Sequence, residues 1–455
     1  DSGAGQPSAA APRFQTALHM TDITPGLASP AAPVRLTTAD GRPLKSALAR
    51  AQARSKRRAF ILVVPLLAFV LVTFVLPIGQ LLKRSIENPD FVEFRDAGSG
   101  EVTPIMQNLK GWFDANPLGT EPDEAAYAAL ATDFLQLKAL KAGGVVGQRI
   151  NFDVSGTRSL FTSTVRGADK LEPPFKEALI ADDKKWADPK IWQAMRAASA
   201  GYTADFYLAA LDRMRDSDGR IVPTPPERQI YVKLYLRTFG LSLVITGICL
   251  VLAFPVAHLL ATLPMRTSNL LMILVLLPFW TSLLVRTTSW MVLLQEQGVL
   301  NDSLVGLGII SDDGRIPMMY NTAGTIIAMT HILLPFMILP LYSVMRTIPP
   351  SYVRAARSLG ATSWTAFRRI YLPQTLPGIG AGALLVFILA VGYYITPALV
   401  GGASGRLISN IIADHMTESL IWSLAAALAA ILLAAVLMLY WLYDRLVGID
   451  NLKLG

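Results

Sequence analysis

The sequence predicts an all-α integral membrane protein with six transmembrane helices and a large polar insert after the first of them. Of its 455 residues 52% are hydrophobic and only 16% are charged, which is less charge than a soluble chain of this length carries. The apolar residues gather in runs of about 20 or more, long enough for a helix to cross a bilayer at about 1.5 Å per residue. The chain length, the low charge and the length of the apolar runs therefore all indicate an integral membrane protein.

Six apolar runs carry this prediction. They lie at 59–82, 234–263, 270–294, 322–345, 378–400 and 420–443. A basic cluster at 54–58 (RSKRR) stands directly before the first run. Since basic residues flank the cytoplasmic ends of spanning helices, we expect the N-terminus in the cytoplasm. Alternation then places Arg266, the loop at 346–373 and the C-terminus on the same side.

Between and beside these runs the composition changes. We expect a disordered cytoplasmic tail at 1–53, rich in Ala, Pro and Gly, and the first transmembrane helix at 54–82. A periplasmic insert follows at 83–230, a five-helix membrane core at 231–447 and a cytoplasmic C-terminus at 448–455. The insert is predicted to be mixed but mainly helical, with an amphipathic helix at 123–142 and short strands within 145–165.

Charge and composition exclude several classes of function. Residues 83–228 hold 19 basic and 22 acidic residues, and the remainder holds 22 basic and 11 acidic ones, a bias that fits membrane topology rather than nucleic-acid binding. A single cysteine, Cys249, and four scattered histidines make no metal site. Because no phosphate-binding Gly-Lys-Ser/Thr loop is present, we expect neither an enzyme nor a resident cofactor.

The polar segment at 354–373, between two apolar runs, has residues that are typical of helices rather than of a loop. Residues 354–373 read RAARSLGATSWTAFRRIYLP. Ser351 is placed to cap a helix at 352–359, and Gly360 suits the left-handed position at its end. Thr362 or Ser363 is placed to cap a second helix at 364–371, which Pro373 closes.

The second of these helices has an aromatic stripe. Trp364, Phe367 and Tyr371 recur at spacings of three and four, so they share one face. An exposed aromatic face on a segment that projects into water predicts a protein partner that covers it.

This segment resembles the cytoplasmic loop of the permease subunits of bacterial ABC importers. That loop carries E-A-A, then G, then I-x-L-P, and Ala355, Ala356, Gly360, Ile370, Leu372 and Pro373 stand in the matching places. Arg354 replaces the Glu of the pattern. With Ser351 as N-cap, Arg354 is the third helical residue, where it cannot complete a capping box.

The resemblance implies the type I importer permease fold and a coupling element at 351–373 that docks on an ATPase subunit. The residues assigned to this docking are Arg354, Ala355, Ala356, Gly360, Ala361, Trp364, Phe367, Ile370 and Pro373. It also implies two ATPase subunits that bind ATP and Mg²⁺, a second permease subunit of different sequence, and a periplasmic substrate-binding protein. The implied location is a bacterial inner membrane, crossed several times.

A further run, W-T-S-x-L-V-R-T at Trp280–Thr287, resembles the spermidine/putrescine branch of the same family. Its Arg286 is a charge inside a spanning run, which normally faces the bundle interior or water. Arg286 either snorkels to the periplasmic surface, lies on the translocation path, or pairs with Glu296 or Asp302. The residues assigned to the path are Trp280, Arg286, Trp290, His331, Tyr393 and Tyr394.

Several alternatives remain open at this point. His331 either hydrogen-bonds across helices or takes part in a proton relay, and Tyr393 and Tyr394 either line the path or belong to an interfacial belt. A secondary transporter would need buried carboxylates in the spans, and a membrane-anchored enzyme or sensor would need a polar site in the insert. The branch resemblance implies a polyamine, whereas Arg286 on the path favours an anionic or zwitterionic solute.

Overall fold

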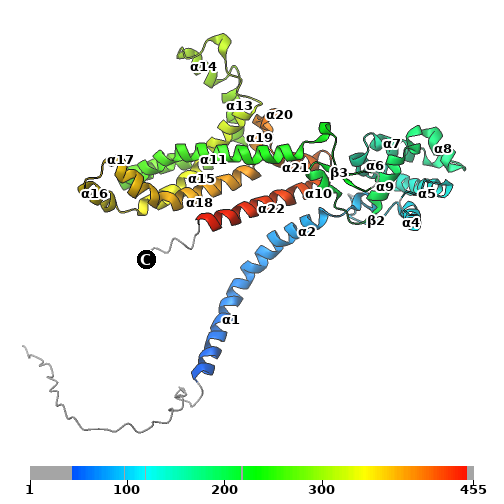
Figure 1. Cartoon of the computed structure of the whole chain (residues 1–455), viewed down its shortest axis with the longest axis horizontal. Coiled ribbons are helices and arrows are strands. Elements are labelled where there is room, and N and C mark those ends of the chain that lie inside the picture. The colour runs from blue at the N-terminus through cyan, green and yellow to red at the C-terminus, as the bar shows by residue number, and fades with distance from the viewer. Residues whose placement is uncertain (1–43, 97, 118, 217–218, 448–455) are drawn as a thin grey trace, which may run out of the picture. The chain divides into compact units, whose positions relative to one another are not determined.

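The computed structural model describes residues 44–447 except 97, 118, 217 and 218, and it is mainly helical (Figure 1). The chain divides into two compact units, 1–75 and 76–455, and each is described by itself. Most of the expected tail and all of the C-terminus at 448–455 lie outside the described residues. The last ten residues of that expected tail, 44–53, are helical, because the first helix begins at Leu44.

The described part of the first unit is one long helix, which is rich in basic residues before position 59 and apolar from Ala59 onward. It comprises α1 (Leu44–Val70) and a π-helical segment, η1 (Leu71–Val75), and it continues as α2 (Leu76–Arg84) of the second unit. The candidate span Ala59–Arg84 buries no side chain within the chain, as expected of a helix that packs against lipid or another subunit. Pro65 lies inside α1, which spanning helices tolerate.

The insert is a small helical domain with its own core. Its helices are α3 (Pro89–Val92), α4 (Gln107–Ala115), α5 (Glu124–Leu140), α6 (Gly143–Asp153), α7 (Thr157–Arg166), α8 (Phe175–Asp182) and α9 (Pro189–Ser199). One antiparallel hairpin, β1 (Glu93–Arg95) with β2 (Val102–Pro104), pairs Glu93 with Pro104. Trp186, Phe134 and Phe161 meet at its centre with ring centroids 5.1–5.6 Å apart. Each such side chain contributes about 1.5–3 kcal/mol by burial.

The helix expected at 123–142 is confirmed as α5, whose N-cap Asp123 accepts the amide of Ala126 at 3.0 Å. The strands expected within 145–165 are wrong, since α6 and α7 occupy that stretch. The reason is packing between the two helices: a Cβ on Gly147 would lie 2.8 Å from Cβ of Phe161. This close approach overrides the strand preference of the local valines.

The two ends of the insert meet. Glu87 and Tyr202 form an antiparallel bridge, the amide of Asn88 donates to Gly201 at 3.1 Å, and that of Thr203 donates to Ile86 at 2.7 Å. Next come α10 (Asp205–Ala210) and a second hairpin of β3 (Arg213–Arg215) and β4 (Ile221–Pro223). These pack outside the insert's core, because Phe206 of α10 belongs to a cluster with residues of α22.

Asp212 connects this region to the first helix of the membrane core. Its Oδ1 accepts the amides of Ile230 and Tyr231 at 3.1 Å each, and its Oδ2 accepts that of Val232 at 2.8 Å. These are amides at the start of α11 (Tyr231–Thr262), which have no partner within their own helix. A carboxylate also suits the positive end of the helix dipole.

The membrane core is built on three mutually packed helices: α11, α15 (Thr322–Thr347) and α18 (Leu372–Gly392) (Figure 1). Cys249, Leu333 and Met337 are among their fully buried contacts. Gly382 permits the close approach of α18 to α15, because a Cβ there would lie 2.7 Å from Sδ of Met337. A fourth helix, α22 (Trp422–Val447), packs against α2, α10 and α21.

The third predicted span is not one straight helix. It consists of α12 (Met265–Leu276), the 3₁₀ turn η5 (Leu277–Trp280) and α13 (Leu283–Leu294), with a 95° bend at the break. Pro278 supplies no amide, and Thr281 is extended before Ser282 caps the new helix. The described residues thus hold five helices fit to cross a membrane, or six if the bent pair is one span.

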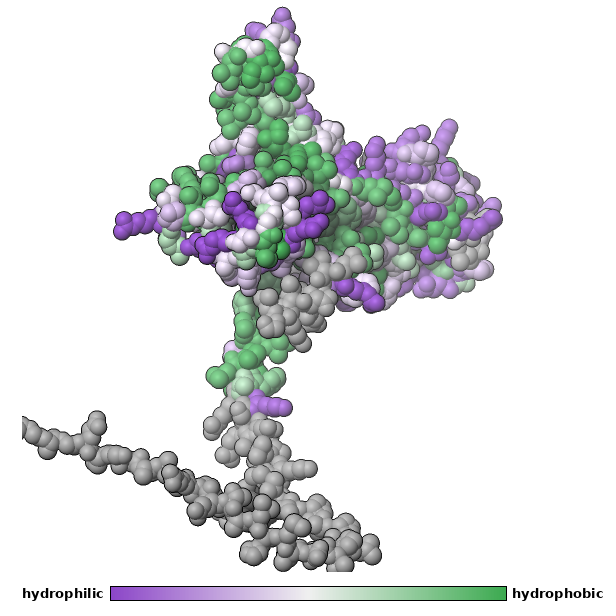
Figure 2. All heavy atoms as spheres, turned by 60° about the vertical axis from the view of Figure 1, so that its left-hand side comes forward, coloured by the Kyte–Doolittle hydropathy of each residue, from purple (hydrophilic) through white to green (hydrophobic). Residues whose placement is uncertain are grey.

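Beyond the break, α13 and α14 (Val299–Gly306) form an arm that leaves the three-helix bundle (Figure 1). Its surface is mostly hydrophobic with hydrophilic side chains at the tip (Figure 2). At that tip Arg315 pairs with Asp302 at 2.7 Å and with Asp312 at 2.8 Å.

The fifth span begins earlier than the expected 378–400. The helical stretch runs from Ser363 to Gly392, and the chain breaks at Tyr393 before α19 (Ile395–Val400). Then α20 (Gly402–Gly405) and α21 (Ile408–Thr417) lead to α22. The break is held by α21, where Ser409 Oγ donates to the carbonyl of Tyr393 at 2.6 Å and Asn410 Nδ2 to that of Tyr394 at 2.7 Å.

Candidate functional site

The coupling element begins one residue earlier than the sequence suggested. α16 (Pro350–Ser358) has Pro349 as its N-cap, and Ser351 makes no capping hydrogen bond. Pro350 fits the first helical position because its missing amide would have no partner there. The predicted Ser351 cap is therefore wrong, and Arg354 is the fifth helical residue. The comparison with a capping-box glutamate does not apply to it.

The turn after α16 is confirmed as a glycine cap. Gly360 has φ +88°. The amide of Ala361 donates to the carbonyl of Ala356 at 3.0 Å, and that of Gly360 donates to Arg357 at 3.0 Å. This pair of bonds is the Schellman motif, which satisfies the last carbonyls of the helix. Thr362 then caps α17 (Ser363–Ala366), its Oγ1 accepting from Thr365 at 3.2 Å.

Pro373 does not close the second helix as predicted. α17 passes through a π-helical segment, η7 (Phe367–Tyr371), directly into α18. The amide of Leu372 donates to the carbonyl of Phe367, five residues back, and this wider turn leaves room for the proline ring that an α-turn lacks. Gln374 Nε2 donates to the carbonyl of Ile370 at 2.7 Å. The coupling element is thereby continuous with a membrane helix.

The aromatic stripe is real, but the chain itself covers part of it. Trp364, Phe367 and Tyr371 stack along one face, with centroids 5.6 and 6.0 Å apart. Phe254 of α11 packs edge-on against Phe367 at 6.0 Å. Nδ1 of His258, also on α11, lies 3.0 Å from the hydroxyl of Tyr371. The expectation of an entirely free aromatic face is therefore wrong for Phe367 and Tyr371.

The apolar surface that stays open on the coupling element is different. Leu359 is 89% exposed, Trp364 67% and Tyr352 52%. We call these three residues the coupling patch. Four arginines of the same element, Arg354, Arg357, Arg368 and Arg369, are also exposed, and residues 322–392 contain no Asp or Glu.

The other residues assigned to docking differ in exposure. Ala355 and Pro373 are exposed, and Ala356, Ala361 and Ile370 are half-buried. Leu359 and Tyr352 were missed by the sequence analysis. Leu359 directly precedes the glycine cap, and Tyr352 follows the double proline. The signal available in the sequence was therefore an apolar residue beside a helix end.

Of the six residues assigned to the path, Trp290 and His331 are in direct contact, and Arg286 and Tyr393 are linked to them electrostatically. Trp290 on α13 donates from Nε1 to Nδ1 of His331 on α15 at 3.0 Å, and their rings meet edge-on at 5.2 Å. Arg286, one turn before Trp290, interacts electrostatically with His331 and with Tyr393. Thr287 fixes this side of α13, with its Oγ1 3.1 Å from that of Thr396 on α19. We call Arg286, Trp290, His331 and Tyr393 the polar cluster.

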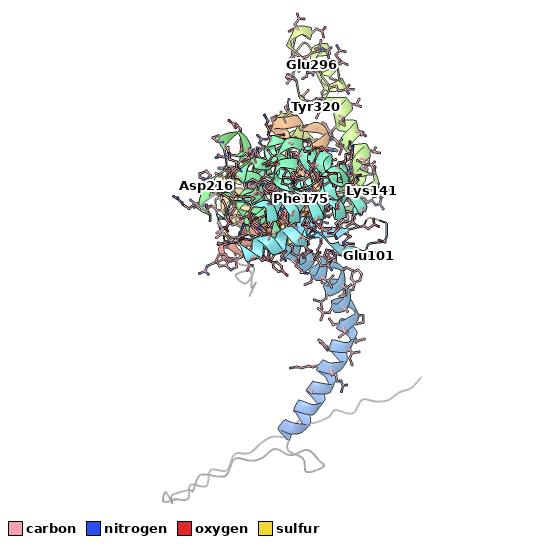
Figure 3. All side chains as sticks on the ribbon, turned by 90° about the vertical axis from the view of Figure 1, so that its right-hand side faces the viewer. Glu101, Lys141, Phe175, Asp216, Glu296 and Tyr320 are labelled. Carbon is pink, nitrogen blue, oxygen red and sulfur yellow. The ribbon has the colours of Figure 1, made fainter. Side chains whose placement is uncertain are left out.

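The other two residues assigned to the path, Trp280 and Tyr394, lie outside the polar cluster. Trp280 is 82% exposed, and among the described residues no ring contact or hydrogen bond links its side chain, or that of Tyr394, to the polar cluster. The suggested acidic partners of Arg286 are also elsewhere. Asp302 pairs with Arg315, and Glu296 lies out on the arm (Figure 3). Nε and Nη1 of Arg286 are buried without a hydrogen-bond partner among the residues that the structure describes.

A second polar surface lies where the insert meets the membrane core. An open hollow of 820 Å³ is lined by Gln148, Asn151, Gly156, Arg158, Ser159, Thr162, Ser163, Arg166, Glu418 and Ser419. It joins α6 and α7 of the insert to the turn after α21. Next to it, Nε2 of His415 lies 3.0 Å from the hydroxyl of Tyr231, and its Nδ1 lies 2.9 Å from Ser419 Oγ.

Within the described ranges, no group of three or more His, Cys, Asp or Glu side chains could hold a metal ion. Cys249 is buried in the bundle, where its Sγ donates to the carbonyl of Thr330 at 3.6 Å. It packs as a small apolar residue.

Comparison with known proteins places these features in context. Residues 250–448 match the family model described as binding-protein-dependent transport system inner membrane component. The chain is 38% identical over 222 residues to the spermidine/putrescine transport system permease protein PotB of Escherichia coli, covering 48% of this chain and 80% of that protein. The PotB protein of Haemophilus influenzae is 35% identical over 222 residues, with 48% and 77% covered.

Two further relatives extend this comparison. The inner membrane ABC transporter permease protein YdcU of Escherichia coli is 33% identical over 189 residues, covering 39% of this chain and 60% of that protein. Among solved structures, the crystal structure of bacterial alginate ABC transporter in complex with alginate pentasaccharide-bound periplasmic protein contains a similar chain. It is 20% identical, with 50% of this chain and 83% of that one covered and a TM-score of 0.40.

Proposed function

Because the chain belongs to the family of binding-protein-dependent transport system inner membrane components, we propose that it lines the path of a small polar solute and couples that path to ATP hydrolysis through residues 350–373. As a member of this family it is a permease subunit of an ABC importer, a multi-pass inner membrane protein and a transport component that is not itself an ATPase.

The observation that carries the coupling role is the continuity of the element with two helices of the core. The glycine cap and the Thr362 cap fix the angle between α16 and α17. The π-turn carries α17 into α18, and Tyr371 contacts His258 of α11. A docked partner that moves α16 therefore moves α17, α18 and α11 with it. Only such a rigid connection transmits a free-energy difference between two states of the transporter.

The coupling patch defines the kind of surface that docks there. Leu359, Trp364 and Tyr352 offer exposed apolar surface, and four exposed arginines lie on the same element without a nearby carboxylate in sequence. Interfaces combine an apolar core with a polar rim of complementary charge. The groove of the partner ATPase is accordingly expected to be apolar at its centre and acidic at its rim, opposite Arg354 and Arg357.

The arrangement in the membrane follows from the same proposal. The coupling element, the N-terminus and the C-terminus face the cytoplasm, and the insert at 83–230 faces the periplasm. Two ATPase subunits, a second permease subunit of different sequence and a periplasmic binding protein complete the importer. The polar hollow between the insert and the mouth of the core is the surface we assign to the binding protein.

The solute is a small polar molecule, polyamine-like or amino-acid-derived. Support for a polyamine is the similarity to permeases named for spermidine and putrescine transport. Support for an amino-acid derivative is Arg286, a cation placed where a polycation would be repelled.

The test is purification of the chain from its native membrane in mild detergent, followed by identification of the bound subunits and by uptake in proteoliposomes. An ATPase subunit, a second permease and ATP-dependent uptake are expected. Leu359→Asp should reduce the amount of bound ATPase at least about tenfold, because it places a carboxylate at the centre of the patch, and Leu211→Asp on the insert is the matched control. Uptake without ATP by a chain that purifies alone would overturn the proposal.

A further inference from the structure

We propose that Arg149 holds the insert against the membrane core at one angle, and that this angle keeps the polar hollow shaped for the binding protein. The inference rests on the proposed function for the identity of that partner, and it names the residue that positions the docking surface. It is drawn from the contacts of a buried arginine between the insert and α10.

Arg149 of α6 contacts three parts of the chain with one side chain, of which only 2% is exposed. Its Nε donates to Oδ1 of Asn88 at 3.0 Å, and its Nη1 pairs with Asp153, one turn further along α6, at 2.7 Å. Its Cζ lies 5.1 Å from the ring centroid of Phe206 on α10, within the range of a cation–π contact. The same guanidinium therefore contacts the start of the insert, its helix α6 and an element outside its core.

Asn88 extends this contact to both ends of the insert. Asn88 is buried, and its backbone amide donates to the carbonyl of Gly201 at 3.1 Å. Its Nδ2 donates to the carbonyl of Ala200 at 3.2 Å. The oxygen of the same side chain accepts from the arginine, so the point where the chain enters and leaves the insert is tied to α6.

Phe152 adds an apolar contact beside the arginine. Its ring centroid lies 5.5 Å from that of Phe206, and Phe206 belongs to the cluster that contains residues of α11, α21 and α22. Aromatic pairs at this separation favour a limited set of orientations. One face of α6 is thus in contact with the membrane core.

The buried ion pair fixes an arrangement more than it adds stability. Removing Arg149 and Asp153 from water offsets much of the attraction between them. Nη2 of Arg149 is also buried without a hydrogen-bond partner among the described residues. A rotated insert would leave more of this charged group unsatisfied, at a further cost in free energy. All its contacts are made together only when α6 lies against α10 in this orientation.

Neighbouring residues of α6 line the polar hollow. Gln148 and Asn151 are three residues apart and so share a face of the helix, and they line the hollow together with the turn at 418–419. Arg149 lies one position further round the same helix. A rotation of α6 against α10 would therefore move one wall of the hollow relative to the other.

The hollow suits a protein surface better than a small solute. None of the side chains that line its 820 Å³ is apolar, whereas small-molecule pockets are lined mostly by apolar groups. Arg158 and Arg166 on α7 place two exposed cations on the insert wall, which favours a partner with carboxylates there. Obligate interfaces are more hydrophobic, so a polar hollow fits a partner that docks and leaves, as a binding protein does.

The first experiment measures how the insert is held. In the full-length chain with Cys249→Ala, spin labels are attached at Leu135→Cys on α5 and Thr417→Cys on α21, both exposed positions. The distance between the labels should have one narrow distribution when Arg149 is present and a broad one in Arg149→Met. Equal distributions would overturn the inference.

Arg196→Met is the matched control. Arg196 is a second arginine of the insert, and its Nη1 donates to the carbonyls of Phe113 at 3.3 Å and of Asn116 at 2.7 Å, both of which belong to the insert. Its loss should lower the Tm and leave the distance distribution narrow. Broadening equal to that of Arg149→Met would mean that any weakening of the insert has this effect, and the specific role of Arg149 would be refuted.

A double variant separates angle from stability. Arg149→Met combined with Asp153→Leu removes both charges, so no buried charge is left alone. It should recover most of the Tm that Arg149→Met loses and keep the broad distribution. A narrow distribution in the double variant would show that the arginine is not what sets the angle.

The second experiment measures docking. ATP hydrolysis by the complete transporter in proteoliposomes is titrated with its own binding protein. Arg149→Met should raise the half-saturating concentration of the binding protein at least about tenfold, because a loosely held insert loses more freedom on docking. The maximal rate should stay as in the wild type, and Arg196→Met should change neither value. An unchanged half-saturating concentration in Arg149→Met would contradict the inference.

Failure of the proposed function gives a different result. A wild-type transporter that hydrolyses ATP equally with and without the binding protein would contradict the assigned partner. The spin-label distances would then decide separately whether Arg149 holds the insert.

Discussion

The hydroxyl of Tyr371 lies 3.0 Å from Nδ1 of His258, which joins the π-helical end of the coupling element to the C-terminal end of α11, a membrane helix. The two rings also meet edge-on at 5.0 Å. Tyr371 is buried and His258 half-buried, so water competes little for this bond. It gives α11 a direct connection to whatever moves the coupling element.

Tyr371→Phe should therefore uncouple the transporter without unfolding it. It removes one hydrogen bond worth about 1 kcal/mol, so about fivefold less solute should be imported per ATP hydrolysed. Uptake and ATP hydrolysis are measured together in proteoliposomes. Tyr440→Phe, at an exposed position of α22 outside the coupling element, is the control, and equal effects of the two changes would argue against the connection.

Gly360→Val should weaken coupling through backbone strain alone. Gly360 has φ +88°, and nothing lies within 4 Å of an added Cβ, so no clash contributes. A residue with a Cβ costs about 1–2 kcal/mol in the left-handed region, and a β-branched one costs more. Lower uptake with normal membrane insertion is expected. Gly240→Ala, in open space on α11 at a helical φ, should leave uptake unchanged, and normal uptake by Gly360→Val would refute the role of the turn.

Leu359→Asp and Phe367→Asp should have different consequences. Leu359 is 89% exposed, so its replacement should weaken ATPase binding and leave the Tm of the isolated chain unchanged. Phe367 is half-buried against Phe254, so a carboxylate there should lower the Tm, since a desolvated charge is costly. Thermal unfolding and ATPase binding are measured for both. A Tm loss with Leu359→Asp would contradict its assignment to an open surface.

Asp212→Ala should loosen the start of α11. It leaves three amides without their acceptor, and each buried unsatisfied donor costs about 1–3 kcal/mol. Faster proteolysis at 219–230 and a lower Tm are expected, with a smaller effect for Asp212→Asn, which keeps one acceptor oxygen. Glu121→Ala, at an exposed position of the insert, is the comparison. An unchanged Tm in Asp212→Ala would show that solvent replaces the carboxylate.

His415 should make stability depend on pH. Burial lowers the pKa of its imidazole, and Asp414 opposes this shift only in part. Since the unfolded chain then binds the proton more tightly, the contribution of His415 is present above a pH of about 6.5 and is lost as the pH falls toward the lowered pKa. The Tm should fall across that window, and His415→Gln should flatten the fall. An identical pH profile in the variant would exclude His415 as its source.

Local signals explain what the sequence could predict. Long apolar runs indicate spanning helices because the bilayer sets their length, and Gly360 and Thr362 indicate a turn through their own backbone and side-chain preferences. The Ser351 cap, the helix end at Pro373 and the unbroken span through Thr281 were predicted wrongly, since the outcome at each depends on π-turns and caps formed with neighbouring turns. The predicted strands in the insert failed because helix packing at Gly147 outweighed local preference.

Some features of the candidate site could likewise be predicted from the sequence, and others could not. Arg286, Trp290, His331 and Tyr393 could each be singled out as polar or aromatic residues in apolar runs. Their meeting depends on how each helix is rotated about its axis and on the break at Tyr393, and neither is encoded locally. His258 was missed because its significance comes only from contact with Tyr371, 113 residues away.

The hydrogen-bonded closure between Glu87 and Tyr202 bears on how the chain is constructed. The segment 88–201 leaves and re-enters at adjacent points, has its own core and lies outside the stretch that matches the family model. Few residues are needed to bridge 87 and 202, so the domain is a cassette that can be excised or grafted without rerouting the polypeptide. A chain with a short linker in place of 88–201 would keep the stretch that matches the family model and lack only the insert.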